Sequence, residues 1–181
     1  MFSFEELDDK TRFWMLVEFR TEKMSGNPYY SSRLTPEGIE AFFQEMEKAL
    51  QTGDEETLIN ALVHPGYWKQ VETYYRGGRA NQRRINPVEA AKQLSCTEFN
   101  TWYVRGFARR LIEEGETQCQ VHRAAPAWQP RAECLSHEGM IYEVRLIYDG
   151  HRARYWPPPG NTGAFSIPVG PNCHHTIRRV R

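Results

Sequence analysis

This sequence has few cysteines, no long apolar run and no basic N-terminal segment, and each absence excludes a class of protein. Its 4 cysteines among 181 residues are scattered, unlike the framework of a disulfide-stapled domain. No stretch approaches the roughly 18 apolar residues of a membrane helix, so we expect no membrane partner. The segment Met1–Glu6 is acidic and lacks the basic start of a secretory signal. We therefore expect a reduced protein that is made in the cytoplasm.

Lysine is scarce in the second part of the chain, and charge is unevenly distributed. Residues 1–75 carry 7 lysines and arginines against 14 acidic residues, a net charge of −7, whereas residues 76–181 carry 16 against 9, a net charge of +7. Of those 16 basic residues 15 are arginines, which suit phosphate and carboxylate groups. The asymmetry predicts a basic face for nucleic acid or an acidic partner. The alternative is that the two parts of the chain attract each other.

Apolar residues make up 40% of the chain and aromatic residues 13%, which is sufficient for a packed core. Helical signals dominate the first two thirds. Ser3 and Glu6 form a capping box, Thr35 with Pro36 begins a second helix, and Asn86 precedes a first-turn proline. The predicted helices cover residues 3–24, 35–51, 55–63 and, as one helix or a helix pair, 87–114.

The last third has the pattern of short strands and loops. Strands are predicted at 118–123, 140–147, 166–169 and 176–180, and a proline-rich loop at 156–160. Helices followed by a small irregular antiparallel β region predict an α+β fold.

A glycine- and arginine-rich stretch, residues 77–86, lies where the charge changes sign and is predicted to be a basic linker. Residues 67–76 before it could be helical or irregular. We therefore divide the chain into an acidic helical region (1–76), the linker, and an α+β domain (87–181).

Two clusters of soft-metal ligands lie near the end of the sequence. Cys134 and His137 form a Cys-x-x-His pair, and Cys173 and His175 form a Cys-x-His pair. Two thiolates and two imidazoles can hold one tetrahedral zinc ion, which would stabilise a β region with little core of its own. His174 is a competing ligand, because adjacent residues of a strand face opposite ways. Alternatively, the cysteines are small buried hydrophobic residues.

The same cluster admits catalytic interpretations. A thiol at Cys173 beside His174 or His175 can be activated as a nucleophile, although no third orienting group is evident. His137, Asn172 and the two adjacent histidines can also be compared with a small metal-dependent nuclease, but the six residues after His175 are too few for its metal-bearing helix.

Arginines interleaved with aromatic residues are candidates for nucleic-acid binding. Arg105 and Arg109 lie in the last predicted helix, and Arg152 and Arg154 precede Tyr155-Trp156. The alternative is a solvated helix face on which Arg105 and Arg109 pair with acidic residues one turn on. In the same helix, the pair Thr97-Glu98 could mark a buried carboxylate.

Taken together, residues 88–180 resemble the C-terminal domain of tailed-phage minor head proteins, the head-morphogenesis family related to gene product F of phage Mu. In that family a helix with a Thr-Glu pair precedes strands, a Cys-x-x-His/Cys element and a terminal Pro-Asn-Cys-Arg-Cys/His motif. The matching segments here are Thr97-Glu98-Phe99-Asn100, Glu114-Gly115, Val121-His122-Arg123, Cys134-Leu135-Ser136-His137-Glu138-Gly139-Met140-Ile141-Tyr142 and Gly170-Pro171-Asn172-Cys173-His174-His175-Thr176-Ile177.

The resemblance implies a non-enzymatic virion or prophage protein, made in the bacterial cytoplasm and packaged near the portal. Its expected partners are portal and capsid proteins, with DNA contacted through the arginine-rich part; no small-molecule substrate is predicted. Here His174 replaces the usual arginine, and a short acidic region replaces the family's long helical N-terminal half. The alternative function is a small metal-dependent nuclease or another nucleic-acid-processing enzyme.

Overall fold

The computed structural model describes residues 2–126, 135–170 and 173–180. Helices precede two small antiparallel sheets, so the predicted α+β fold is confirmed. In chain order the elements are α1 (Asp9–Met24), α2 (Pro36–Thr52), α3 (Glu55–Leu62), the 3₁₀ helix η1 (Pro65–Tyr67), β1 (Val71–Arg76), β2 (Arg79–Arg84), α4 (Pro87–Glu113), β3 (Gln118–Arg123), β4 (Ile141–Glu143), α6 (Val144–Asp149) and β5 (His175–Arg179).

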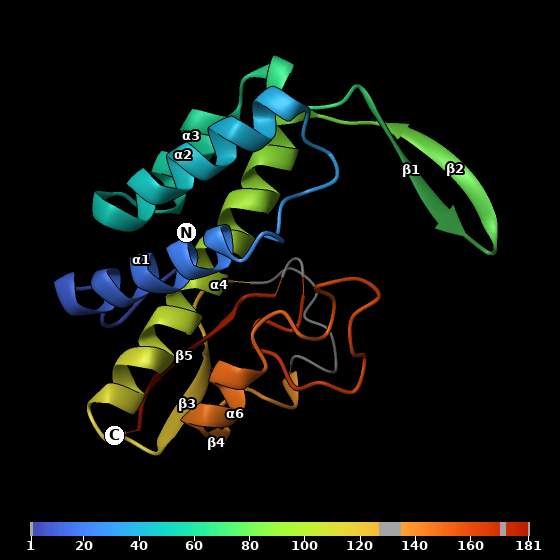
Figure 1. Ribbon diagram of the computed structural model, residues 1–181. Coiled ribbons are helices and arrows are strands. Elements are labelled where there is room, and N and C mark those ends of the chain that lie inside the picture. Colours follow the sequence, from blue (N-terminus) through green and yellow to red (C-terminus); the bar gives the residue numbers. More distant parts are fainter. Residues whose placement is uncertain (1, 127–134, 171–172, 181) are drawn as a thin grey trace.

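Helix α4 lies at the centre of the molecule, and most other elements pack along it (Figure 1). α1 and α3 contact it directly, and α2 packs mainly on α1 and α3. α6 and β5 contact it as well, on the side of the C-terminal sheet. Because neighbours surround α4, its buried residues are not confined to one stripe.

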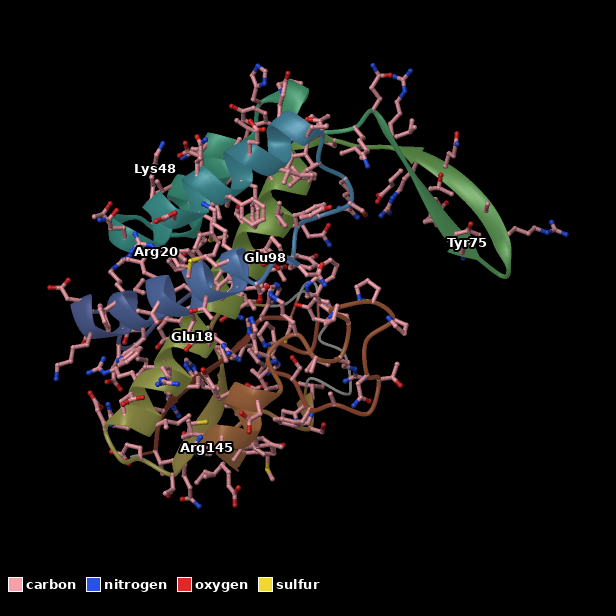
Figure 2. The ribbon with its side chains drawn as sticks, in the orientation of Figure 1. Glu18, Arg20, Lys48, Tyr75, Glu98 and Arg145 are labelled. Carbon is pink, nitrogen blue, oxygen red and sulfur yellow. The ribbon has the colours of Figure 1, made fainter. Side chains whose placement is uncertain are left out.

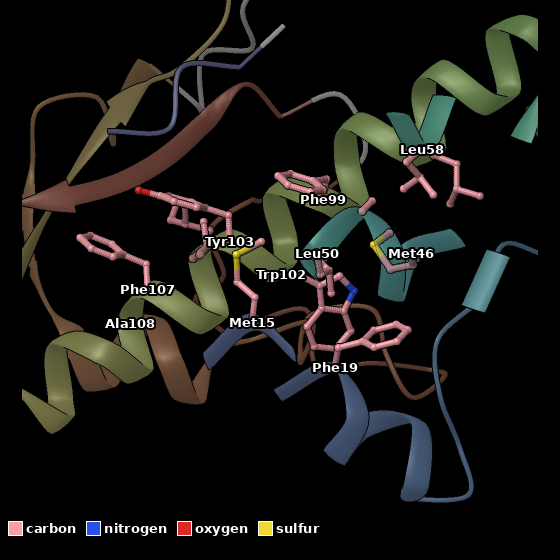
Figure 3. Packing of buried hydrophobic residues seen from close by; sticks show 14 of the residues in the cluster. Met15, Phe19, Met46, Leu50, Leu58, Phe99, Trp102, Tyr103, Phe107 and Ala108 are labelled. Carbon is pink, nitrogen blue, oxygen red and sulfur yellow. The ribbon is translucent and has the colours of Figure 1, made fainter. Parts of the chain in front are cut away.

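One hydrophobic core joins the N-terminal helices to the C-terminal sheet. Figure 3 shows Phe19 of α1 beside Trp102 of α4, with ring centroids 5.3 Å apart. Met46 of α2 lies towards one end of this cluster and Phe107 of α4 towards the other. Ile177 of β5 belongs to the same core. The core therefore contains residues from both sides of the predicted linker.

The close contact between α1 and α4 depends on Gly106. A Cβ atom at this position would lie 2.5 Å from the backbone nitrogen of Met15 and 2.7 Å from its Cα. Distances that short cannot occur without movement of the α1 backbone. Glycine therefore allows the two helices to approach backbone against backbone, which brings Glu18 of α1 near Arg105 of α4.

The predicted boundaries hold for three helices and fail for the first. α2 and α4 begin at their predicted caps, α3 begins at the predicted Glu55, and α4 is one continuous helix. α1 begins at Asp9 rather than at Ser3, because the carboxylate of Asp8 accepts the backbone N–H of Thr11. The backbone N–H of Ser3 instead donates to the carbonyl of Ala124, at 2.8 Å. That contact holds the N-terminal segment against the C-terminal part.

Residues 77–86 are not a linker, and residues 71–76 are neither helical nor irregular. β1 and β2 pair antiparallel from Val71↔Arg84 to Arg76↔Arg79. Gly77 and Gly78 connect them with φ angles of 58° and 75°, as a two-residue hairpin turn requires. Adjacent glycines occur both in flexible linkers and in tight turns, which explains why a linker was predicted here instead of a hairpin. In Figure 1 this hairpin projects away from the rest of the molecule.

The C-terminal sheet has the order β4-β3-β5, with both pairings antiparallel. The strands predicted at 118–123 and 176–180 are confirmed by β3 and β5. The strand predicted at 140–147 is only partly correct, because it becomes helix α6 at Val144. Val144 and Ile147 are both buried, and their spacing fits one helical turn. Residues 166–169 form no strand. Among the described residues, no helix is long and apolar enough to cross a membrane.

Candidate functional site

A buried ion pair between Glu98 and Arg152 lies between the helices and the C-terminal loop. Their side chains are 1% and 2% exposed. The guanidinium donates to both carboxylate oxygens, from Nη1 at 3.1 Å and from Nη2 at 2.6 Å. A bidentate pair of this kind fixes the relative orientation of the two side chains as well as their distance. Figure 2 shows Glu98 at the centre of the molecule, where α1, α4 and the loop meet.

The backbone and two aromatic rings hold Arg152 in this position. Its φ angle is +52°, the one positive value at a described residue other than glycine. An L-residue adopts such a conformation at an energetic cost, so the interactions of its side chain must compensate. Its guanidinium carbon lies 4.6 Å from the centre of the Tyr29 ring and 5.0 Å from that of Trp102. Cation–π contact therefore adds to the ion pair.

The network continues from Arg152 to Glu22 and His151. Glu22 accepts from Nε of Arg152 at 3.2 Å, and its carboxylate lies 3.2 Å from Nε2 of His151. Burial alone would raise the pKa of Glu22, but Arg152 and His151 outweigh that effect and lower it to about 2. Burial lowers the pKa of His151 to about 3, so the imidazole is neutral near pH 7. Glu22 and His151 therefore keep one protonation state near pH 7.

Ion pairs of this kind connect the acidic first part of the chain to the basic second part. Arg105 donates to Glu18 at 2.7 Å and to the carbonyl of Tyr148 at 2.7 Å. Tyr148 in turn donates its hydroxyl to Glu18 at 2.9 Å. Further pairs across the two parts are Asp8–Arg110, Glu22–Arg152, Glu5–Arg178 and Glu6–Arg179. Ion pairs within the protein thus neutralise much of the charge difference between the two parts of the sequence.

This pairing changes the interpretation of the four arginines predicted to bind nucleic acid. Arg152 is buried and cannot reach a nucleic acid, so that prediction is wrong. Arg105 is held by Glu18, and its side chain is 21% exposed. Arg109 pairs with Glu113 at 2.6 Å, as the helix-face alternative expected, and lies over the Trp14 ring. Arg154 is half-buried in the same loop as Arg152. The four therefore do not form one exposed surface.

The structure brings together two of the four residues predicted to bind zinc. Sγ of Cys173 lies 3.9 Å from Nδ1 of His175. Nδ1 of His137 lies 2.7 Å from the hydroxyl of Tyr142, which leaves Nε2 as its ring nitrogen for a metal. Cys134 lies outside the described residues. Within residues 2–126, 135–170 and 173–180, no group of three or more histidine, cysteine or acidic side chains is arranged to hold a metal ion.

The catalytic interpretations of this cluster concern the same side chains. Cys173 is 3% exposed, which limits access to its thiol, and Asn172 lies outside the described residues. Nε2 of His175 lies 3.5 Å from the carboxylate of Glu138. His174, the competing ligand, lies edge-on to the ring of Phe2, with centroids 5.9 Å apart. These contacts are those of packed side chains at the edge of the core.

One signal in the sequence concerned the buried network. The pair Thr97-Glu98 in mid-helix could mark a buried carboxylate, with an exposed helical glutamate as the alternative. Glu22 and Arg152 had no comparable signal. Glu22 lies near the end of a helix, where charged residues are ordinary, and Arg152 is in a loop. Their pairing depends on segments far apart in the chain.

The chain matches no protein family, no curated protein and no solved structure in three separate comparisons. Two features of the structure bear on its function. Acidic and basic side chains neutralise one another in the interior, and a hairpin projects from the body.

We expect Glu98→Gln to lower the free energy of unfolding by about 3–5 kcal/mol, because it leaves the Arg152 charge buried with less compensation. Arg152→Met should be similarly damaging. The double variant should cost less than the sum of the two, since it removes both charges. Urea unfolding of the four proteins measures this. The control is Arg20→Ala, which breaks an exposed pair with Glu47 and should cost at most about 1 kcal/mol. If the double variant lost as much stability as the two single variants together, direct coupling between Glu98 and Arg152 would be contradicted.

We also expect the protein to lose stability as the pH falls below about 6.5, with His151 contributing. In the folded protein the pKa of His151 is lowered from 6.5 to about 3, so only the unfolded chain binds the proton between these values. Linkage then reduces stability by about 1.4 kcal/mol per pH unit. Glu22 acts in the same direction, because its contribution is lost as the pH falls from 4.5 towards 2.

The variant His151→Gln keeps a hydrogen-bonding side chain but cannot titrate. Between pH 7 and pH 5, the wild-type protein should lose about 2 kcal/mol more stability than the variant. Urea unfolding at both pH values measures the difference. Equal losses in the two proteins would show that His151 is not the titrating group.

Proposed function

We propose that this chain is a non-enzymatic minor head protein of a phage or a prophage-derived particle. In this proposal it is made in the bacterial cytoplasm, is packaged near the portal and contacts portal and capsid components, with DNA as a further partner. The observation that carries the proposal is that the segments resembling the head-morphogenesis family, although distant in sequence, contact one another.

Hydrogen bonds connect these segments directly. Asn100, beside the Thr-Glu pair, donates its side-chain amide to the carbonyl of His175 at 2.8 Å. In the sheet, Val121 pairs with Ile177, and its carbonyl accepts the N–H of Gly139 at 2.8 Å. Glu138 also lies within 3.5 Å of His175. Contact among these four segments supports the interpretation that they form one structural unit.

The chemistry of the interior supports a binding role rather than catalysis. Glu98 and Arg152 are the most deeply buried charged pair among the described residues. Both carboxylate oxygens of Glu98 accept from Arg152, which also donates to Glu22. A general acid or base must reach its substrate. The burial and mutual pairing of these two side chains favour the interpretation that they hold the fold together.

Co-assembly tests the proposal. The chain should be co-expressed with the portal and capsid proteins encoded beside its gene, and assembled particles should be separated on a density gradient. We expect the chain to migrate with the particles and to be detected there by mass spectrometry. Its absence from particles, or a gene neighbourhood without portal and terminase genes, would overturn the minor-head proposal.

The nuclease alternative gives a different result in a second assay. Nicking of plasmid DNA with added Mg²⁺ or Zn²⁺, abolished by His174→Ala or His175→Ala, would replace the proposal with an enzymatic function. The matched control is His64→Ala, which changes an exposed histidine beside η1. Nicking that persists in every variant would indicate a contaminating nuclease.

We further propose that a zinc ion stabilises the C-terminal sheet through Cys173 and His175, with Cys134 and His137 as the other ligands. The short distance between the Cys173 thiol and the His175 imidazole supports this pair. Elemental analysis of the purified protein should find about one zinc ion per chain. Cys173→Ala should lose it and unfold at lower urea concentration. Absence of zinc, together with unchanged stability in Cys173→Ala, would overturn the zinc proposal.

A further inference from the structure

The hairpin of β1 and β2, residues 71–84, is an exposed basic arm. All of its residues are exposed except Glu72 and Asn81, which are half-buried. It contains four arginines and one glutamate, a net charge of +3. Figure 2 shows Tyr75 on the arm, well away from the core around Glu98. An isolated pair of strands gains little stability from its own side chains. We therefore expect the projecting hairpin to contact another molecule.

The tip of the basic arm places two positive charges opposite each other. Arg76 and Arg79 are register partners on either side of the Gly77-Gly78 turn. Neither pairs with a carboxylate in the part of the chain that the structure describes, and the same is true of Arg84. Like charges directly opposite each other destabilise a strand pair. A bound polyanion would remove that repulsion.

The base of the basic arm is anchored to the body, so its direction is fixed. Glu72 accepts from Nε of Arg33 at 2.7 Å and also pairs with Arg83. Arg33 in turn donates to the side chain of Gln93 on α4 at 2.7 Å. Arg83 also lies over the Tyr74 ring, 5.3 Å from its centre. Arg83 is therefore part of the support, and Arg76, Arg79 and Arg84 remain as the outward charges.

We propose that the basic arm binds the phosphate backbone of duplex DNA, with the two-stranded ribbon in the major groove. The major groove is wide enough for such a ribbon, and arginine is well suited to phosphate oxygens. This inference rests on the proposed function, because DNA packaged beside a portal would be the ligand.

The composition of the arm favours DNA over an acidic protein. Stable protein interfaces have a desolvated apolar centre. The arm has only Val71, 46% exposed at its base, and two tyrosines as large hydrophobic side chains. Its other exposed residues are arginine, threonine, glutamine, alanine and glycine. A surface of this kind contacts a charged backbone more readily than it buries apolar area.

The experiment measures binding of the full chain to a short duplex by fluorescence anisotropy at several salt concentrations. Arg76→Ala/Arg79→Ala should bind more weakly, and the slope of log K against log salt should become shallower by about 1 for each arginine removed. The control is Arg20→Ala/Lys48→Ala, which removes two exposed positive charges from α1 and α2, far from the arm in Figure 2. The control should bind nearly as the wild type does.

Circular dichroism should show that both variants are folded. Unchanged binding by Arg76→Ala/Arg79→Ala, or an equal loss in the control, would overturn the inference. Binding of labelled poly-glutamate, with no binding of the labelled duplex, would overturn it in favour of an acidic protein partner. Binding only to single-stranded DNA, lost in Tyr75→Ala, would overturn the groove assignment. If the chain assembles into particles but does not bind DNA, only the DNA-binding inference is wrong. If it binds DNA but does not assemble into particles, only the minor-head proposal is wrong.

Discussion

The buried pair of Glu98 and Arg152 is the constraint on which much of this structure depends. A charge taken out of water destabilises the protein unless a partner remains beside it, so α4 and the loop after α6 must come together whenever the chain folds. Because Glu22 of α1 also pairs with Arg152, α1 must lie beside the same two segments. The pair need not add much net stability, but it fixes how these three segments are placed.

That constraint also explains the uneven charge of the sequence. Acidic residues of the first part, such as Glu18 and Glu6, are the partners of arginines in the second, such as Arg105 and Arg179. The two parts therefore attract each other inside one molecule, and they share one core. Once these pairs are formed, Arg76 and Arg79 at the tip of the hairpin are among the described arginines that have no carboxylate partner.

Local signals predicted the helices well because caps and first-turn prolines act over a few residues. Thr35 and Asn86 are examples, and the α+β order followed from them. The hairpin was missed because Gly77-Gly78 has the same composition in a flexible linker and in a tight turn. Arg152 was misassigned because its burial depends on Glu98, which is distant in sequence. Of the residues predicted to bind zinc, the structure brings Cys173 and His175 together, and Cys134 lies outside the described residues.

The central claim is that the interior charges hold the fold while the basic arm makes the external contact. Hydrogen–deuterium exchange of the full chain with and without duplex DNA tests this most directly. We predict that DNA slows exchange across residues 71–84 and leaves residues 97–110 and 137–152 unchanged. Protection centred on Arg105, Arg109 or His175 instead, with no change in the hairpin, would contradict the account.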